Sequence, residues 1–508
     1  MTTPSRSHRR RRAPAASSRL ARIVDRLPAS GPAQAAVMAG VLLFAAVVVG
    51  LAGHAADPVR AGTDEVSSAD LVCPGVVDRL PGARSTLTVA ALPPDSAATG
   101  AMTVTDLAAG APVRGSSSKP GVSVIDTSKD GAPAVLIRGR DGLAPGLSGE
   151  SVIEPTTGAG NALSATTCAQ PGISQWFIGA STALGRRDRL VLANPAPVPA
   201  SVDLSFWADT GPLSVPNSAD IAVPANGATT LPLDVMAPGH ERLAIQVTAS
   251  RGAVAASLND LGAVGATVNG DDWLAPVVGP DRSLVLPGLP DRTTARTLYL
   301  ATPGDRDAIV KVRLLTADND VAPAGADTVT VQAGRVGEYD LSAAAAGQAA
   351  AVVVTSDQPV LASVRSTRAE GGGTDFAWAG AVPALSGPAV LPDARSNAAG
   401  ATSLLLAAPR GGTIHVALRL PNGTTRSTDV RIPADRAVAL PEATGGTGRF
   451  SVIVTPAAGS GPVYAASVLR LGPSGITVVP LLPERVSVVV PAVVPDVTVV
   501  TAGNQSRP

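Results

Sequence analysis

The sequence repeats with a period near 100 residues, and each period consists of short strand-like runs. Runs of β-branched and small apolar residues, such as TLTVAA at 86–91 and SVIVT at 451–455, are separated by Gly, Pro, Asn and Asp clusters every eight to twelve residues. This pattern is typical of antiparallel sandwiches and barrels. About seven short strands per 100 residues is the size of an immunoglobulin-like sandwich. We therefore predict an all-β fold of tandem immunoglobulin-like β-sandwich modules.

Three tryptophans mark the repeat. Trp176, Trp273 and Trp378 lie 97 and 105 residues apart, each within a segment that resembles the others. The matching segments are 175–195, 272–290, 376–392 and 476–495. Because a residue at a fixed place in a module is more often core than ligand platform, we expect these three side chains in the core. The stretches 243–258, 351–364 and 450–468 also correspond to one another, and each is predicted to be a hairpin.

The repeat and the flanking composition divide the chain into segments. We predict a basic arm at 1–32, a transmembrane helix or signal anchor at 33–52, a tether at 53–70, a divergent β module at 71–175, β modules at 176–272, 273–377 and 378–495, and a tail at 496–508. The alternative fold is a β-propeller, although propeller blades usually repeat at about 40 to 50 residues.

Residues 33–52 carry no charged side chain. At about 1.5 Å per helical residue, they span roughly 30 Å, the thickness of a bilayer's hydrocarbon core. Eight arginines and a single acid precede them, so the positive-inside rule predicts a cytoplasmic N-terminus and an extracytoplasmic remainder. A cleaved signal peptide is the competing interpretation, because the secretion machinery also reads a basic start and an apolar run. Both interpretations export the same part of the chain.

Beyond the basic arm, the chain is acidic and contains both cysteines. It has 32 basic and 39 acidic residues there, a net charge of −7, which argues against nucleic acid as a partner. Cys73 and Cys168 lie beyond the membrane segment, where oxidation is permitted. We expect them to form a disulfide, and two free thiols are the alternative.

The residues that usually carry catalysis are few and scattered. After residue 54 the histidines are His240 and His415, in different repeats, and neither a zinc-site spacing nor a G-x-S-x-G motif is present. The S-x-x-K match at 116–119 lies in a Gly/Ser/Pro loop without a K-T-G partner. The clusters at 269–272 and 318–320 offer oxygen ligands to calcium, but they are also ordinary turn sequences. We predict no enzymatic activity, no cofactor and no metal site.

Aromatic residues make up only 2% of the chain. Sugar-binding clefts usually present exposed Trp or Tyr faces, so this scarcity argues against an extensive cleft of that kind. Trp207 lies outside the repeated positions, and we identify it as a candidate ligand contact.

The sequence resembles a family of actinobacterial membrane-anchored envelope proteins that share a domain of unknown function. The resemblance is carried by the arginine-rich start and apolar segment, by LVCP at 71–74, by CAQPGISQWFIG at 168–179 and by the strand start at 194–202. It covers most of the exported part. Because the family has no established activity or site residues, the resemblance implies a compartment and a fold, and it implies nothing about mechanism.

These features predict a non-enzymatic, membrane-anchored scaffold or interaction protein of the cell envelope. Its partner would be another envelope protein, contacted through loops and exposed strand edges. The alternative is a protein that binds wall polysaccharide or assists a glycosyltransferase. A hydrolase with dispersed carboxylates is a third hypothesis, although the sequence does not indicate a particular pair.

Overall fold

The computed structural model divides the chain into two compact units. One comprises residues 65–488, and the other comprises residues 1–64 together with 489–508. The described residues are 39–40, 43, 62–75, 77, 83–93, 97–108, 110–127, 134–155, 162–265, 267–344, 347–397, 400–440 and 448–490. β1 (Gly62–Glu65) and β35 (Ser487–Val490) pair in a two-stranded sheet. The remaining strands lie in the larger unit.

The predicted membrane segment 33–52 lies outside the described residues, except for Ala39, Gly40 and Leu43, which are helical. Within the part of the chain that the structure describes, no helix has the length and apolar character needed to cross a bilayer. The predicted arm at 1–32 and the tail at 496–508 also lie outside the described residues.

Module 1 is a pair of facing antiparallel sheets. Its strands are β2 (Ser68–Pro74), β3 (Ala83–Ala91), β4 (Gly100–Asp106), β5 (Val113–Ser117), β6 (Gly121–Asp126), β7 (Ala134–Asp141), β8 (Leu147–Pro155) and β9 (Ser164–Thr167). They form the sheets β2-β7-β4-β5 and β6-β3-β8-β9. Side chains at alternating positions, among them Leu87, Val104 and Ile137, pack between the sheets. Cys73 and Cys168 form a disulfide within this core.

Module 2 repeats the arrangement and adds one short helix. Its elements are β10 (Ser174–Ala180), β11 (Arg186–Asn194), β12 (Ala200–Ala208), β13 (Gly211–Leu213), β14 (Ile221–Val223), β15 (Gly227–Pro232), α3 (Leu233–Met236), β16 (Leu243–Arg251), β17 (Ala255–Val264) and β18 (Thr267–Leu274). One sheet is β10-β16-β12-β13 with β14 on β12, and the other is β15-β11-β17-β18. Phe177, Phe206 and Ile245 lie in the core, which Phe376 and Trp378 of module 3 complete.

Module 3 has one strand that belongs to both of its layers. Its strands are β19 (Asp281–Leu289), β20 (Ala295–Ala301), β21 (Ala308–Leu315), β22 (Asp320–Val321), β23 (Thr328–Val331), β24 (Val336–Asp340), β25 (Ala350–Glu370) and β26 (Gly373–Gly380). The first half of β25 pairs with β19 and β21, and its second half pairs with β20 and β26. Leu298, Val312 and Val352 lie in the enclosed core.

Module 4 is a strongly bent sheet around its own core. Its strands are β27 (Ala389–Asn397), β28 (Gly400–Ala408), β29 (Gly412–Arg419), β30 (Thr425–Ile432), β31 (Arg436–Leu440), β32 (Gly448–Pro456), β33 (Tyr464–Leu471) and β34 (Gly475–Leu481). The order is β30-β29-β32-β27-β28-β33-β34, with β31 on β28. β27 pairs first with β32 and then, at its end, with β28. Leu391, Leu404 and Val416 fill the core.

None of the three stretches predicted to be hairpins forms a hairpin. β16 and β17, which occupy most of 243–258, belong to different sheets of module 2. β32 and β33 each pair with strands other than each other. In 351–364 the chain continues through β25 without a turn. Two strands separated by a polar break have the same sequence pattern whether they pair with each other or with other strands. The prediction was therefore wrong about the partner strands.

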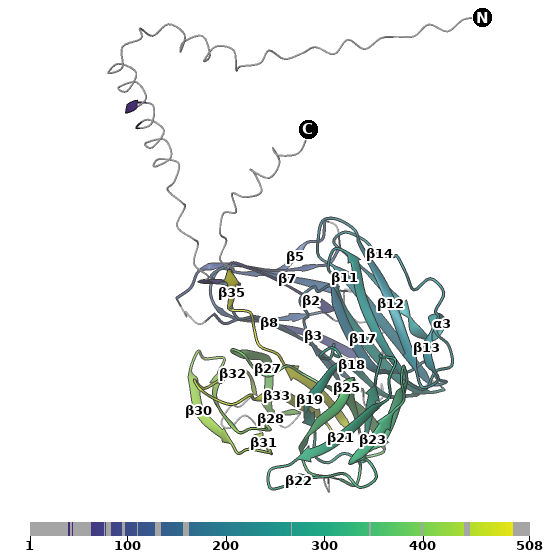
Figure 1. The fold of residues 1–508 in the computed structure, drawn as a ribbon. Helices are drawn as coiled ribbons and strands as arrows, with labels where there is room; N and C mark the ends of the chain where they lie inside the picture. Colours follow the sequence, from purple (N-terminus) through teal and green to yellow (C-terminus); the bar gives the residue numbers. More distant parts are fainter. Residues whose placement is uncertain are drawn as a thin grey trace, which may run out of the picture. The chain divides into compact units, whose positions relative to one another are not determined.

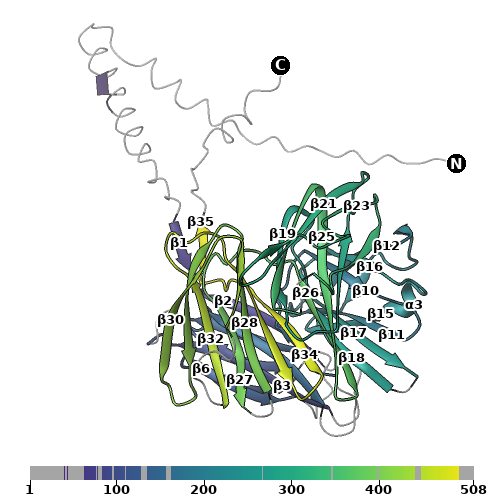
Figure 2. The ribbon, with the colours of Figure 1, turned by 90° about the horizontal axis from the view of Figure 1, so that it is seen from below.

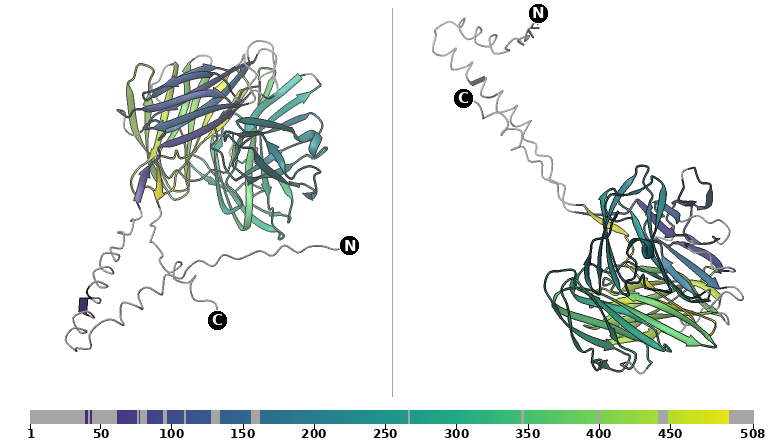
Figure 3. Two further views of the ribbon diagram at one scale, coloured as in Figure 1. Left: turned by 90° about the horizontal axis from the view of Figure 1, so that it is seen from above. Right: turned by 90° about the vertical axis from the view of Figure 1, so that its right-hand side faces the viewer.

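The last strands of the four modules, β9, β18, β26 and β34, form a central ring. β18 contacts β26, β26 contacts β34, β34 contacts β9, and β9 contacts β18. The modules occupy four neighbouring sectors in chain order, from purple-blue through teal and green to yellow-green (Figure 1). The same grouping is visible from below and from two further directions (Figure 2 and Figure 3). Module 4 therefore packs against module 1 and closes the ring.

The all-β prediction is confirmed, and the four modules are arranged like the blades of a propeller, which was the alternative fold. Each blade contains two layers of strands, which accounts for a period about twice that of ordinary blades. An immunoglobulin-like topology for the modules stays a prediction. The boundaries predicted after residues 175, 272 and 377 fall within β10, β18 and β26.

Small side chains line the contacts between modules. Ala193 and Ala255 lie between modules 1 and 2, and Ala377 and Ala466 lie between modules 3 and 4. Gly270 is more constrained, because its φ is 142° and a Cβ atom there would collide with the Phe376 ring. Alanine thus allows the sheets to approach closely at these two interfaces, and Gly270 does so between modules 2 and 3.

One hydrogen-bonded chain links all four modules at the ring. The backbone N–H of Ala165 in module 1 donates to the Thr477 hydroxyl of module 4 (3.1 Å), which donates to the carboxyl of Asp272 in module 2 (2.7 Å). The same carboxyl accepts from the backbone N–H of Trp378 in module 3 (2.8 Å). Asp272 is fully buried, so these bonds replace the water that its carboxyl has lost.

Asp375 on β26 makes a second set of ring contacts. Its carboxyl accepts from the backbone N–H groups of Leu163 in module 1 (3.0 Å) and Ile476 in module 4 (3.1 Å). Burial raises the pKa of both Asp272 and Asp375 well above the ordinary range, which favours their uncharged form.

The disulfide generates a first prediction. The double variant C73A/C168A is expected to lower the free energy of unfolding by about 4 kcal/mol, because the disulfide closes a loop of 95 residues in the unfolded chain. Denaturant unfolding of the full chain measures this change. Thiol labelling of the untreated protein without reductant should find no free thiol, and quantitative labelling of both cysteines would contradict the pairing.

The ring generates a second prediction. Asp272→Asn keeps one acceptor for the Trp378 N–H, and its amide N–H replaces the O–H of the uncharged carboxyl as a donor to the Thr477 oxygen, so it should cost about 1 kcal/mol or less. Asp272→Ala removes the hydrogen-bond partner of both the Trp378 N–H and the Thr477 hydroxyl inside a buried site, and it should cost about 3 kcal/mol or more. Unfolding curves at pH 7 compare the two, with Asp327→Asn at an exposed position as the control. Equal losses for both Asp272 variants would show that the charged carboxylate is required.

Candidate functional site

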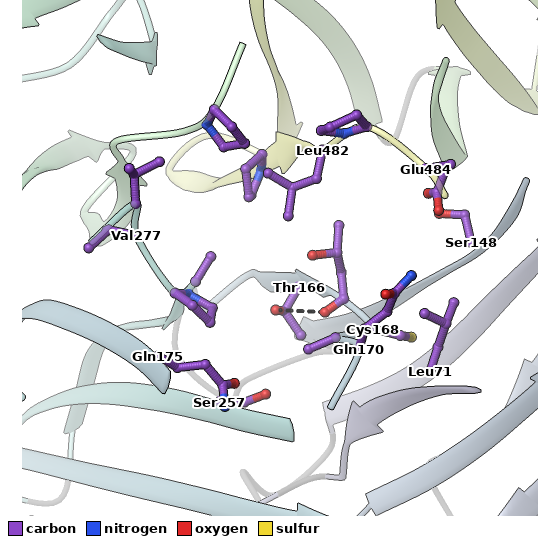
Figure 4. Close-up of a pocket in the computed structure, with 18 of the residues that line it drawn as sticks. Leu71, Ser148, Thr166, Cys168, Gln170, Gln175, Ser257, Val277, Leu482 and Glu484 are labelled. Atoms are coloured by element: carbon purple, nitrogen blue, oxygen red, sulfur yellow. Dashed lines mark hydrogen bonds between the residues drawn. The ribbon is translucent and has the colours of Figure 1, made fainter. Parts of the chain in front are cut away.

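A cavity of about 430 Å³ opens where the ring strands end. We call it the axial pocket. All four modules or the linkers that follow them contribute to its lining: Leu71, Ser148 and Thr166–Gln170 from module 1, Gln175, Ser257 and Leu274 from module 2, Ala275–Val278 and Pro383 from the next two linkers, Val390 and Pro480 from module 4, and Leu482–Arg485 after it. Figure 4 shows these side chains facing a common space, with Glu484 and Ser148 together at one side.

Backbone hydrogen bonds fix the wall segments on each side of the pocket. The Val277 N–H donates to the Trp176 carbonyl (2.8 Å), and the Val278 N–H donates to the Ala381 carbonyl (3.0 Å). The Glu484 N–H donates to the Pro388 carbonyl at 2.8 Å. These bonds hold the linkers in place, so the pocket is pre-formed rather than assembled by a mobile loop.

Glu484 has the most unusual environment in the pocket. Desolvation raises its pKa to about 8, and a hydrogen bond with Ser148 opposes this shift. The Ser148 hydroxyl donates to the Val390 carbonyl (3.2 Å), which leaves its oxygen available as an acceptor. Because desolvation outweighs the hydrogen bond with Ser148, the carboxyl group of Glu484 is mostly uncharged at neutral pH.

The lining is mostly apolar and contains little that could catalyse a reaction. Pro276, Pro383, Pro480 and Pro483 form much of the wall. Among the described lining residues, Glu484 and Arg485 alone have ionisable side chains, since Cys168 is in the disulfide. Most glycosidases use a pair of carboxyl groups, and the pocket has one. The arrangement is suited to binding.

A pair of buried carboxyl groups lies between modules 1 and 4. Glu150 on β8 accepts from the backbone N–H of Asp393 on β27 (3.2 Å), and burial together with the Asp393 charge raises the pKa of Glu150 to about 8. Asp393 binds Arg395 (2.7 Å) and Arg449 (3.0 Å). Both carboxyl groups are almost fully buried. This pair therefore holds two modules together and is closed to a substrate.

The structure separates the tryptophans that the sequence grouped. Trp273 and Trp378 lie on ring strands and are buried, as expected. Trp176 lies on β10, the first strand of module 2, and is half-buried, so the prediction of an equivalent core position was wrong for it. Trp207 does not line the axial pocket and contacts Trp176 in a second hollow.

Most of the other sequence candidates lie away from the axial pocket. Cys168 lines the pocket through its disulfide, whereas His240 and His415 are not among the lining residues. Asp271 and Asp272 are buried in the ring, and Asp320 is paired with Arg313. Among the residues that the structure describes, no group of three or more His, Cys, Asp or Glu side chains is placed to hold a metal ion. Sequence reasoning missed Glu484, although it lies in a recognised repeat segment, 476–495.

Comparisons with known proteins identify a family, but they identify no curated relative. The family model with the description "Family of unknown function (DUF5719)" matches residues 124–443. No curated protein matches the chain.

Similar solved structures are remote. They include a structure titled Thermotoga maritima 1070 (14% identity, TM-score 0.17, 20% of this chain and 95% of that chain) and a tetra-tandem repeat in the extending region of a large adhesion protein (14%, 0.10, 84% and 100%). A Bacteroides uniformis β-glucuronidase is 12% identical, with a TM-score of 0.11, over 39% of this chain and 25% of that one. At these TM-scores the likenesses carry no argument about fold or function.

The pocket generates a third prediction. The proton of Glu484 is bound more tightly in the folded state than in the unfolded state, so its contribution to stability is present below about pH 4.5 and is lost as the pH rises toward about 8. Glu484→Gln should therefore lose less stability than the wild type between pH 5 and 8, by at most about 1.4 kcal/mol per pH unit.

Thermal and denaturant unfolding at several pH values measure this difference. Glu241→Gln, at an exposed position, serves as the control and should follow the wild type. Parallel curves for Glu484→Gln and wild type would contradict the raised pKa.

Proposed function

The chain belongs to a family of proteins of unknown function, DUF5719, and we propose from its own structure that it is a non-enzymatic binding protein of the cell envelope. In this proposal the four modules are a rigid scaffold, and the axial pocket binds a segment of a partner protein. The resemblance to a domain family of unknown function is confirmed by the family match. An actinobacterial origin and a membrane anchor are part of the proposal.

The proposed compartment is supported by the disulfide and by the N-terminal sequence. Disulfides persist in oxidising compartments, and the bond between Cys73 and Cys168 closes the core of module 1. The basic arm and the apolar segment 33–52 would place this module outside the membrane. The net charge of the exported part favours a partner other than nucleic acid.

The proposed ligand follows from the lining of the pocket, which is the observation that carries this proposal. A pre-formed cavity of about 430 Å³ has the size of a binding site for a few side chains. Its proline and aliphatic walls favour an apolar ligand, and the uncharged Glu484 and the hydroxyl of Ser148 offer hydrogen bonds to neutral groups. An apolar peptide segment with free backbone amides combines these two requirements.

The absence of enzymatic activity is proposed on the same grounds. The pocket has one carboxyl group, and the buried pair Glu150 and Asp393 is engaged by arginines and by the module interface. The third sequence hypothesis, a hydrolase with dispersed carboxylates, thus gains no support from these sites.

The fourth prediction concerns the partner of the axial pocket and is tested by site-specific photocrosslinking. A photoreactive amino acid at Leu482, which is 39% exposed at the pocket, should capture a discrete protein partner when the full chain is expressed in its native host. The same group at Val198, which is 61% exposed in module 2 and outside the pocket, should not capture that partner.

A variant that fills the pocket sharpens this test. Ala275 is half-buried and lines the pocket, so Ala275→Trp should occupy the cavity and abolish the capture at position 482. Its thermal unfolding is measured in parallel to show that the fold is kept. Equal capture from both positions, or capture that persists when the cavity is filled, would contradict the proposal.

A further inference from the structure

A second hollow, of about 420 Å³, lies between modules 2 and 3. We call it the tryptophan hollow. Trp176 on β10 and Trp207 on β12 form one wall, and the turn 302–306 with Gln358 and Pro359 forms the other. Both indoles lie on the face of the sheet opposite the module core, because their neighbours Phe177 and Phe206 point into that core. The ring centroids are 5.2 Å apart, and the ring planes are tilted by 33°.

We propose that the tryptophan hollow binds a pyranose ring of a glycan. This site is separate from the axial pocket and does not depend on the function proposed for it. The indoles provide an apolar surface for the C–H groups of a sugar, and the facing polar side chains provide hydrogen bonds to its hydroxyls.

Packing between the modules does not account for all of the indole surface. Part of each ring contacts the apolar cluster of Ile178, Ala244 and Val277, yet both rings remain half-buried. In the buried Trp378, the indole Nε1–H has a protein acceptor, because it donates to the Asp260 carboxyl at 2.8 Å. Among the described residues, neither Trp176 nor Trp207 has an indole N–H acceptor in the protein, and neither nitrogen is among the buried polar atoms without a partner. These two N–H groups are therefore available to a ligand.

The distance between the indoles decides which side a ligand occupies. A ligand ring held between two aromatic rings needs about 7 Å between them, twice the ordinary contact distance. At 5.2 Å the two indoles contact each other. A ligand therefore lies on their open side as on a platform, which suits a puckered sugar ring better than an intercalated planar ring.

The opposite wall supplies the polar groups that a sugar requires. Asp305 and Arg306 are exposed, and Gln358 is half-buried, with all three lining the hollow. Among the described residues, the carboxylate of Asp305 and the guanidinium of Arg306 have no ion-pair partner within 4.0 Å. A carboxylate accepts, a guanidinium donates and an amide does both, so the three groups match vicinal hydroxyls.

The experiment is the titration of the full chain with chitotetraose, cellotetraose and maltotetraose, followed by intrinsic tryptophan fluorescence and by saturation-transfer NMR. We expect at least one of the three to bind. Trp207→Ala and Arg306→Ala should each weaken that binding by about tenfold or more. Arg410→Ala, which changes an exposed residue in the corresponding turn of module 4, should leave the binding unchanged.

Two results would overturn the proposal. The first is no saturation transfer to any of the three oligosaccharides from the wild-type chain. The second is wild-type affinity in both Trp207→Ala and Arg306→Ala. Because Arg306 lies on an exposed turn, its variant tests the site even if Trp207→Ala disturbs the fold, and circular dichroism records whether it does.

Discussion

The arrangement of the four modules depends on hydrogen bonds that buried carboxyl groups make across the ring. A strand that is covered on both faces has no water to satisfy a polar side chain, so each such side chain must find a protein partner. Asp272 and Asp375 meet this requirement with donors from other modules, and each therefore fixes two neighbours at once. Apolar interfaces lined by alanine bring the modules together, while these directional bonds define how they are placed.

Much of the architecture could be predicted from the sequence because it depends on local pattern. The alternation of apolar residues and the turn clusters identified the strands, and the period near 100 residues identified the modules. The closed ring was predicted only as the alternative fold, because it depends on contacts between segments far apart in the sequence, such as that between Asp272 and Thr477. The Asn-Gly-Asp-Asp sequence at 269–272 resembles a turn, yet it lies on a ring strand whose acids are buried.

The candidate sites illustrate the same limit. Trp176, Trp273 and Trp378 occupy similar apolar patterns, so the sequence alone did not distinguish the first strand of a module from its last. Glu484 is an ordinary glutamate in a proline-rich linker, and its pKa is raised by burial among walls contributed by several modules and linkers. Trp207 was identified by its place outside the repeat, and its partner Trp176 became apparent only when β10 and β12 were seen beside β16.

Closure of the ring also determines how residues 65–488 respond to force. Val66 donates a backbone hydrogen bond to Val486 (3.1 Å), and β8 of module 1 packs against β27 of module 4. The two ends of this unit therefore lie together, and the modules are not joined in series between them. Tension applied to both ends would therefore load the contacts at this junction before it loads the cores of the modules. The folded unit therefore adds little to the distance between its two ends, whereas a row of sandwiches would act as an extended spacer.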